Sequence, residues 1–253
     1  MDDVEIFYDD VANNYIKDHA SRFVDDVFEH LLLSYLPKPP CTILDAGGGI
    51  GRFALPLAKR KYIVVLSDIS QGMVDKAKEL AILNSLKDIS FFKESVTNMK
   101  HQQNNSFDVV LLLNGVLDYC HNAKEALKEV YRVLKKDGLI IGTVNNRFIY
   151  TTTNILLEKK DINEFTNSFT TGNYSKKFPI HDFTCDELIL LLNTSHFTLI
   201  DVLGPTNLLR KWEYEQMVTE KNRLELLKLQ MTFAKRKEYI NNSTDFFFVA
   251  KKL

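Results

Sequence analysis

The sequence predicts an α/β protein built on a doubly wound, mostly parallel β-sheet. Between residues 41 and 144, short apolar runs that are typical of buried strands alternate with segments of helical periodicity. A glycine cluster follows the first of these runs, and a phenylalanine-rich run at 246–250 is typical of one more buried strand. Alternation of this kind places helices on both faces of a parallel sheet.

We expect a single domain over residues 1–253, because this length with 45% hydrophobic residues can bury one sizeable core. The expected parts are a helical flank over 1–40, which a proline cluster ends, a core over 41–144, and covering insertions at 145–183 and 207–240. A capping-box pattern at Thr184 and Glu187 predicts a helix between the two insertions. The expected strands are 43–45, 62–68, 89–93, 107–114, 139–144, 197–203 and 246–250.

The glycine cluster is preceded by an acid. Asp45 ends the first expected strand, a Gly-Gly-Gly-Ile-Gly run follows, and helical apolar spacing then begins. Glycines at such a turn let a ligand lie against bare backbone amides at a helix N-terminus. The acid would repel a pyrophosphate but could receive an ammonium group, so a cationic cofactor is favoured. The segment from Gly49 to Ala54 also satisfies a dinucleotide-binding pattern, which is weak evidence by itself.

The segment Asp45-Ala46-Gly47-Gly48-Gly49-Ile50-Gly51 resembles the acidic-x-Gly-x-Gly-x-Gly motif of class I S-adenosylmethionine-dependent methyltransferases, here of the small-molecule type. The resemblance is strong over about residues 40–145. It implies a Rossmann-like fold in which the final strand is antiparallel. It also implies that the cofactor is S-adenosyl-L-methionine, with its methionine end held by Asp45, Gly47, Gly49 and Gly51.

The second expected strand ends in another acid. Asp68 follows the glycines by about 20 residues, which is the spacing of one strand-helix-strand unit. In the family that the sequence resembles, an acid at this position accepts hydrogen bonds from both ribose hydroxyls. Ile69 and Met73 belong to the start of the following helix, and we expect them beside the cofactor.

The resemblance extends to the ends of the third and fourth strands. Glu94 and Ser95 stand where the family usually carries Asp-Ala near the adenine amino group. Asn114 ends the fourth strand, beside which the family places methyl transfer. The sequence departs from the family at Lys61 and His196, since both positions usually carry glycine.

Candidate acceptor-side residues follow the fourth and fifth strands. Asp118 and Tyr119 are candidate substrate contacts. Arg147 would pair with a substrate carboxylate or phosphate, or else hold the loop by bonding carbonyls. The catalytic candidates are Tyr15, from a flank that related enzymes often lay over the cofactor, and His181, as a base. A packed aromatic and a surface histidine are the plainer interpretations of these two residues.

Composition restricts the possible partners. A formal net charge of −1 and a pI of about 6.6 provide no overall basic field, so nucleic acid and anionic membranes are unexpected partners. The three cysteines lack CxxC spacing, which argues against a disulfide framework and a zinc cluster, and we predict no metal site. The absence of a signal-like segment or an 18-residue apolar run predicts a cytoplasmic protein.

The expected function is methyl transfer from S-adenosyl-L-methionine to a small molecule by in-line displacement, releasing S-adenosylhomocysteine. The aromatic residues of the covering segments favour a closed pocket, in which alignment and water exclusion suffice without a metal. Methylation of RNA remains an alternative, for which basic pairs at 159–160, 176–177 and 210–211 are the only signals. A nicotinamide-dependent oxidoreductase and a non-catalytic cofactor-binding module also remain open, as do the acceptor atom and the oligomeric state.

Overall fold

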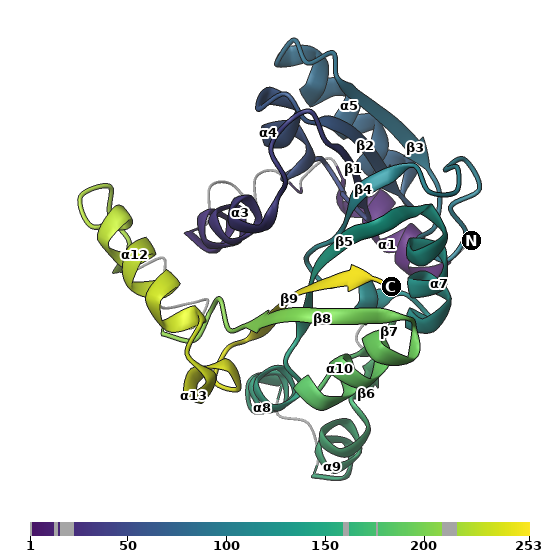
Figure 1. Cartoon of the computed structure of the whole chain (residues 1–253). Helices are drawn as coiled ribbons and strands as arrows, with labels where there is room; N and C mark the ends of the chain where they lie inside the picture. Colours follow the sequence, from purple (N-terminus) through teal and green to yellow (C-terminus); the bar gives the residue numbers. More distant parts are fainter. Residues whose placement is uncertain (1, 13–14, 16–22, 159–161, 176, 209–216) are drawn as a thin grey trace.

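A seven-stranded sheet forms the centre of the computed structural model, which describes residues 2–12, 15, 23–158, 162–175, 177–208 and 217–253 (Figure 1). The strand order is β3-β2-β1-β4-β5-β9-β8. The neighbours from β3 to β5 pair in parallel, whereas β9 is antiparallel to both β5 and β8. This arrangement confirms the predicted fold class and the antiparallel final strand. The strands are β1 Thr42–Ala46, β2 Ile63–Asp68, β3 Ile89–Lys93, β4 Phe107–Leu112, β5 Leu134–Asn145, β8 Phe197–Leu203 and β9 Asp245–Lys252.

Helices cover both faces of the sheet. Those before β5 are α1 Asp3–Val11, α3 Phe23–Tyr35, α4 Ala54–Lys59, α5 Gln71–Leu83, α6 Val116–Tyr119 and α7 Ala123–Val133. Those after it are α8 Arg147–Glu158, α9 Ile162–Thr171, α10 Cys185–Thr194, α12 Arg223–Ala234 and α13 Lys237–Ile240. The capping box at Thr184 and Glu187 is present at the start of α10, as predicted. Within the described ranges, no helix has the length and apolar character to cross a bilayer.

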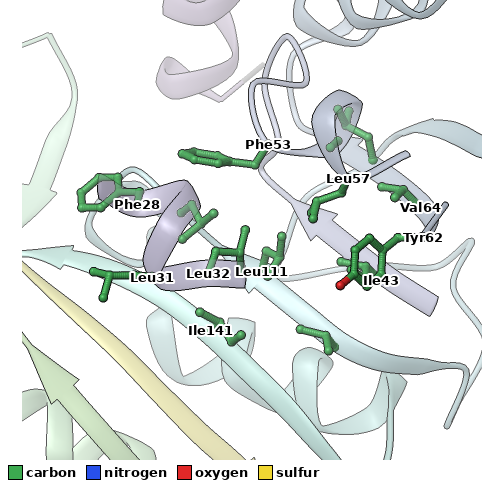
Figure 2. Close-up of a cluster of buried hydrophobic side chains, with 14 of the residues drawn as sticks. Phe28, Leu31, Leu32, Ile43, Phe53, Leu57, Tyr62, Val64, Leu111 and Ile141 are labelled. Atoms are coloured by element: carbon green, nitrogen blue, oxygen red, sulfur yellow. The ribbon is translucent and has the colours of Figure 1, made fainter. Parts of the chain in front are cut away.

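The core consists of one hydrophobic cluster on each face of the sheet. Figure 2 shows the cluster that contains Phe28 and Leu31 of α3 together with Ile43 of β1. The next residue in β1, Leu44, belongs to the cluster on the opposite face, which α7 and α10 cover. Since successive side chains of a strand point to opposite faces, a strand that is buried on both faces needs a continuous apolar run. The sequence shows such runs in β1, β4 and β5.

The order of the strands reverses between β1 and β4. The chain proceeds outward from β1 to β3 and then crosses back to add β4 on the other side of β1. Ligand sites of open α/β sheets lie at the carboxyl ends of the strands at this switch point. The segments that leave β1 and β4 are the glycine loop and the residues from Asn114 onward, so the fold brings these two predicted segments together.

The region 145–183 has more regular structure than its sequence indicates. It folds as α8 and α9 followed by a hairpin of β6 Asn173–Ser175 and β7 Pro179–His181. In Figure 1, α8, α9 and α10 lie together below β8. The second predicted insertion, 207–240, contains α12 and α13, and its residues 209–216 lie outside the described residues.

Two departures from the family's glycine pattern have a backbone explanation. Lys61 and His196, which stand where glycine is usual, adopt positive φ angles of 69° and 65°. Both residues therefore occupy the left-handed region, in which a side chain costs about 1–2 kcal/mol relative to glycine. The turns retain the conformation that favours glycine even though the residue has changed.

Candidate functional site

The glycine loop after β1 is fixed by backbone hydrogen bonds to β2. The N–H groups of Gly47 and Gly48 both donate to the carbonyl of Ser67, at 2.7 and 3.0 Å. Gly47, Gly49 and Gly51 have φ angles of +77°, +54° and +85°. These left-handed conformations explain why the turn is made of glycine.

Asp45 lies buried beneath this loop with 2% of its surface exposed. Its Oδ2 has no hydrogen-bond partner among the described residues. A Cβ on Gly48 would lie 2.9 Å from that oxygen, so the glycine leaves the carboxylate uncovered by any side chain at this point. Burial, with a smaller contribution from Asp68, raises the pKa of Asp45 to about 7. An unsatisfied carboxylate of this kind fits a ligand ammonium group.

Asp68 ends β2 beside the same loop. Its Oδ2 accepts the Gly49 N–H at 2.8 Å, and its Oδ1 accepts the Ser70 N–H at 2.9 Å. Burial raises the pKa of Asp68 to about 6, although these two N–H groups act in the opposite direction. Each carboxylate oxygen has a further lone pair, so the group can still accept hydrogen bonds from two ligand hydroxyls.

A cavity of about 400 Å³ opens in front of the loop, within the usual size range of small-molecule sites. Eight of the ten predicted cofactor residues line it. They are Gly47, Gly49, Asp68, Ile69, Met73, Glu94, Ser95 and Asn114. The other two, Asp45 and Gly51, are not among the lining residues, and Asp45 instead lies directly behind Gly48. The cavity and the acid beneath it therefore fit the cofactor that the motif implies.

Glu94 contributes to the cavity in a different way from the family's usual aspartate. Its Oε1 accepts a 2.6 Å hydrogen bond from the Gln102 side chain, and its Oε2 accepts the N–H of His101 at 3.2 Å. The longer side chain thus fixes the loop that follows β3. Ser95, Val96 and Thr97 also line the cavity, so backbone groups of this segment are available to an adenine ring.

The predicted acceptor-side residues divide into two groups. Tyr15 and Tyr119 line the cavity, whereas Asp118, Arg147 and His181 do not. Asp118 is 1% exposed, and its Oδ1 accepts the backbone N–H of Asn145 at 2.8 Å. The Asp118 carboxylate is therefore buried against β5 and does not line the cavity.

Arg147 holds the insertion together. Its guanidinium donates to the carbonyl oxygens of Asp182 and Thr170 and pairs with the Glu187 carboxylate. Only 4% of the residue is exposed. Of the two roles that the sequence left open, the structure shows the bonding of carbonyls and places the side chain outside the cavity lining.

His181 lies at the end of β7 and is also outside the lining. Its Nδ1 is 2.8 Å from Oδ1 of Asn173, and its ring meets Phe183 edge to face. Burial lowers the pKa of His181. The prediction of a base at this position assumed an irregular loop over the strand ends, whereas the residue belongs to a regular hairpin.

Residues of α1 and of the β6–β7 hairpin cover the cavity, and we refer to Tyr8, Tyr119 and Phe178 as its aromatic roof. Val4 and Tyr8 of α1 line the cavity, and the Tyr8 ring packs with Phe178 from the hairpin at a centroid distance of 6.3 Å. Asp9 fastens α1 to the body, because its Oδ1 accepts the Ser70 hydroxyl at 2.6 Å and the Gly72 N–H at 2.9 Å. The helical spacing of the N-terminal flank was the signal for α1, and Phe178 is one of the aromatic residues of the covering segment 145–183 that favoured a closed pocket.

Residues 44–142 match the family described as "Methyltransferase domain". The ubiquinone/menaquinone biosynthesis C-methyltransferase of Zymomonas mobilis is 32% identical over 129 residues, which are 51% of this chain and 51% of that protein. The tRNA 5-carboxymethoxyuridine methyltransferase of Escherichia coli is 29% identical over 99 residues, or 39% of this chain and 38% of that protein. The chain thus spans about half or less of the length of these curated relatives.

Solved structures show the same fold over a larger part of the chain. The 1,6-didemethyltoxoflavin-N1-methyltransferase of Burkholderia thailandensis, whose structure contains 1,6-didemethyltoxoflavin and S-adenosylhomocysteine, superposes with a TM-score of 0.65 at 17% identity. The match covers 99% of this chain and 87% of that one. The sequence matches named here are methyltransferases and not oxidoreductases. Residues 44–142 are therefore similar to a methyltransferase domain, and the chain has the fold of solved S-adenosylmethionine-dependent methyltransferases.

Proposed function

We propose that this chain transfers the methyl group of S-adenosyl-L-methionine to a small-molecule acceptor and releases S-adenosylhomocysteine. The observation that carries the proposal is the roofed cavity in front of the glycine loop. Tyr8 and Tyr119 line it from α1 and α6, and Phe178 packs against both of their rings. A roof of this kind suits an acceptor that the cavity can surround.

The residues of the site would bind and orient the cofactor and would exclude water from the reacting atoms. When bound, the cofactor supplies an electrophilic methyl group on a positively charged sulfur. Asp45 would pair with its ammonium group and Asp68 with its ribose hydroxyls, which fixes the direction of the methyl group. The aromatic roof would keep water from the reacting atoms. Asn114, held by a 2.8 Å hydrogen bond from its N–H to the Thr143 hydroxyl, ends the wall where the acceptor would approach.

The test is production of S-adenosylhomocysteine. The protein is incubated with S-adenosyl-L-methionine and with two fractions of a cell extract, one of molecules below about 1 kDa and one of total RNA. We expect turnover with the small-molecule fraction and none after Asp45→Asn. Turnover with RNA alone would contradict the small-molecule proposal, and cofactor binding without turnover in either fraction would favour a non-catalytic module.

RNA methylation is the second candidate, because one relative is a tRNA methyltransferase. Most of the basic residues that favoured it, at 159–160, 176 and 210–211, lie outside the described residues. Lys177 is described, and its ammonium group lies 4.7 Å from the centroid of the Phe7 ring. If RNA is the acceptor, its binding should weaken steeply with salt, since phosphate contacts release counterions.

A further inference from the structure

The cavity wall formed by α1, α6 and the residues after α6 is separate from the loop that would hold the methionine end of the cofactor. It includes Tyr8, Tyr119, His121 and Asp2, and a 3.0 Å contact between His121 Nε2 and Asp2 Oδ2 joins its two sides. We assign this wall to the acceptor, an assignment that rests on the proposed function. Its chemistry therefore bears on the class of acceptor.

The cavity lining carries more acidic than basic side chains. It has four carboxylates, which are Asp2, Asp68, Glu94 and Glu125. Arg52 and His121 are the lining side chains able to carry positive charge within the described residues, and each contacts an acid. Arg52 Nη1 lies 2.9 Å from Oδ1 of Asp25, whereas its Nη2 has no hydrogen-bond partner among the described residues, and His121 contacts Asp2. The acidic side chains of the lining therefore outnumber the basic ones by four to two.

Three tyrosine rings line the cavity, at positions 8, 15 and 119. The rings of Tyr8 and Tyr15 are 6.3 Å apart and nearly perpendicular. Tyr119 meets Phe178 edge to face with centroids 5.4 Å apart. The faces of such rings carry partial negative charge and attract cations.

Two buried acids lie behind Tyr119. Asp118 and Asp182 are 1% and 0% exposed, and each keeps one carboxylate oxygen without a hydrogen-bond partner. Asn145 links them, since its backbone N–H donates to Asp118 at 2.8 Å and its side chain donates to Asp182 at 2.9 Å. Both acids and the Asn145 side chain act on the pKa of Tyr119, which burial raises. The hydroxyl of a ring that lines the cavity therefore lies within electrostatic reach of both acids.

No basic side chain in the described part of the chain forms an ion pair with either carboxylate. Arg147 approaches Asp182 but donates to its backbone carbonyl. Burial accordingly raises the pKa of both acids, that of Asp182 to about 7. An ammonium group on the cavity side of Tyr119 would favour the ionised form of these two acids, so its binding should strengthen as pH rises above about 7.

We infer that the methyl acceptor is an amine, held at its nitrogen against the Tyr119 ring with Asp118 and Asp182 behind it. The ammonium form enters and loses one proton to water, which frees the nitrogen lone pair. That pair forms the new N–C bond while the C–S bond breaks and its electrons remain on sulfur. The methylated product then carries the positive charge.

The test compares three probes of similar shape and different charge, namely benzylamine, benzyl alcohol and benzoate. Each is titrated by calorimetry into the full chain saturated with S-adenosylhomocysteine. We expect benzylamine to bind about 3- to 30-fold more tightly than the alcohol, with benzoate weakest. Benzylamine should also support production of S-adenosylhomocysteine from S-adenosyl-L-methionine.

Asp118→Asn should reduce the preference for the amine over the alcohol, because it removes a carboxyl group that can ionise yet keeps an oxygen for the Asn145 N–H. Asp186→Asn, at an exposed acid in the first turn of α10, is the matched control and should leave the preference unchanged. If Asp118→Asn does not fold, Asp182→Asn replaces it. Binding of the alcohol or benzoate as tightly as benzylamine, or of none of the three, overturns the inference. Failure of S-adenosylhomocysteine to bind would instead count against the proposed function.

Discussion

The backbone N–H of Gly49 donates a 2.8 Å hydrogen bond to Oδ2 of Asp68, so the acid that ends β2 holds the glycine loop that follows β1. The other carboxylate oxygen accepts the N–H of Ser70, the N-cap residue of α5. One side chain thus fixes two walls of the cavity, and it can do so only with both oxygens available as acceptors.

Asp68→Asn should weaken binding of S-adenosylhomocysteine by about 10- to 100-fold, the usual worth of one charge-assisted hydrogen bond. An amide offers one acceptor where the structure uses two, so either Gly49 or Ser70 loses its partner. Calorimetric titration measures the effect, and Asp75→Asn on the exposed face of α5 is the control. Equal affinities for the two variants would show that Asp68 does not contact the ligand.

Gly47 and Gly49 should respond differently to alanine. A Cβ on Gly47 would lie 2.5 Å from Val116 Cγ2, whereas a Cβ on Gly49 meets nothing within 4 Å. Gly47→Ala should therefore lower the free energy of unfolding by about 1–3 kcal/mol, by overpacking and backbone strain. Gly49→Ala should show mainly weakened cofactor affinity, because its methyl group projects into open space. Chemical denaturation and calorimetry separate the two effects, and the reverse ranking would contradict this geometry.

The pKa of Asp45 predicts opposite effects of pH on stability and on binding. Its folded-state pKa of about 7 lies above the ordinary value of 3.8, so the folded chain binds the proton more tightly than the unfolded chain does. The contribution of this group to stability is fully present below about pH 4 and is lost as pH rises through about 7. Binding of a cationic cofactor needs the carboxylate form, so its affinity should rise over the same interval.

Asp45→Asn should change both the stability of the ligand-free protein at high pH and the pH dependence of cofactor binding. The ligand-free variant should be more stable than the wild type at pH 8, by on the order of 1–3 kcal/mol, because no charge is left buried. Its affinity for S-adenosyl-L-methionine should lose most of its pH dependence. Thermal unfolding at pH 5 and pH 8 tests the first point, and an unchanged pH profile of binding would argue against Asp45 as the group that titrates.

Lys61→Gly should stabilise the protein, against the usual trend for glycine substitutions. Lys61 is exposed with a φ of 69°, and the relief of left-handed strain exceeds the added entropy of the unfolded chain, for a gain of about 0.5–1 kcal/mol. Lys59→Gly at the end of α4 should cost a similar amount. Denaturation midpoints compare the two, and a loss of stability in both variants would show that residue 61 is not strained.

The bounds of the two edge strands of the sheet, β3 and β8, follow from their sequences. β3 and β8 have the predicted bounds, because their apolar runs end at polar or turn residues. β5 begins five residues earlier than expected, at Leu134. The Lys136-Asp137-Gly138 turn is absorbed into the strand where its register against β4 shifts. A turn signal specifies local dihedral angles, and pairing with a neighbouring strand can accommodate those angles as an irregularity.

The cofactor side of the site was predictable from local sequence because its motif is contiguous and its geometry follows from one strand-turn-helix unit. The acceptor side was predictable only in part, since it assembles Tyr8, Tyr119 and Phe178 from segments far apart in the chain. For Arg147 the sequence left two roles open, one of them the bonding of carbonyls. Its position after β5 did not identify the carbonyls of residues 170 and 182 as the partners of its guanidinium.

The central claim is that Asp45 pairs with the ammonium group of the cofactor bound at the glycine loop. Calorimetric titration of the wild type with S-adenosylhomocysteine and, separately, with NADH tests this most directly. We predict measurable binding of S-adenosylhomocysteine, weaker binding in Asp45→Asn, and no binding of NADH. Tight binding of NADH without binding of S-adenosylhomocysteine would contradict the account.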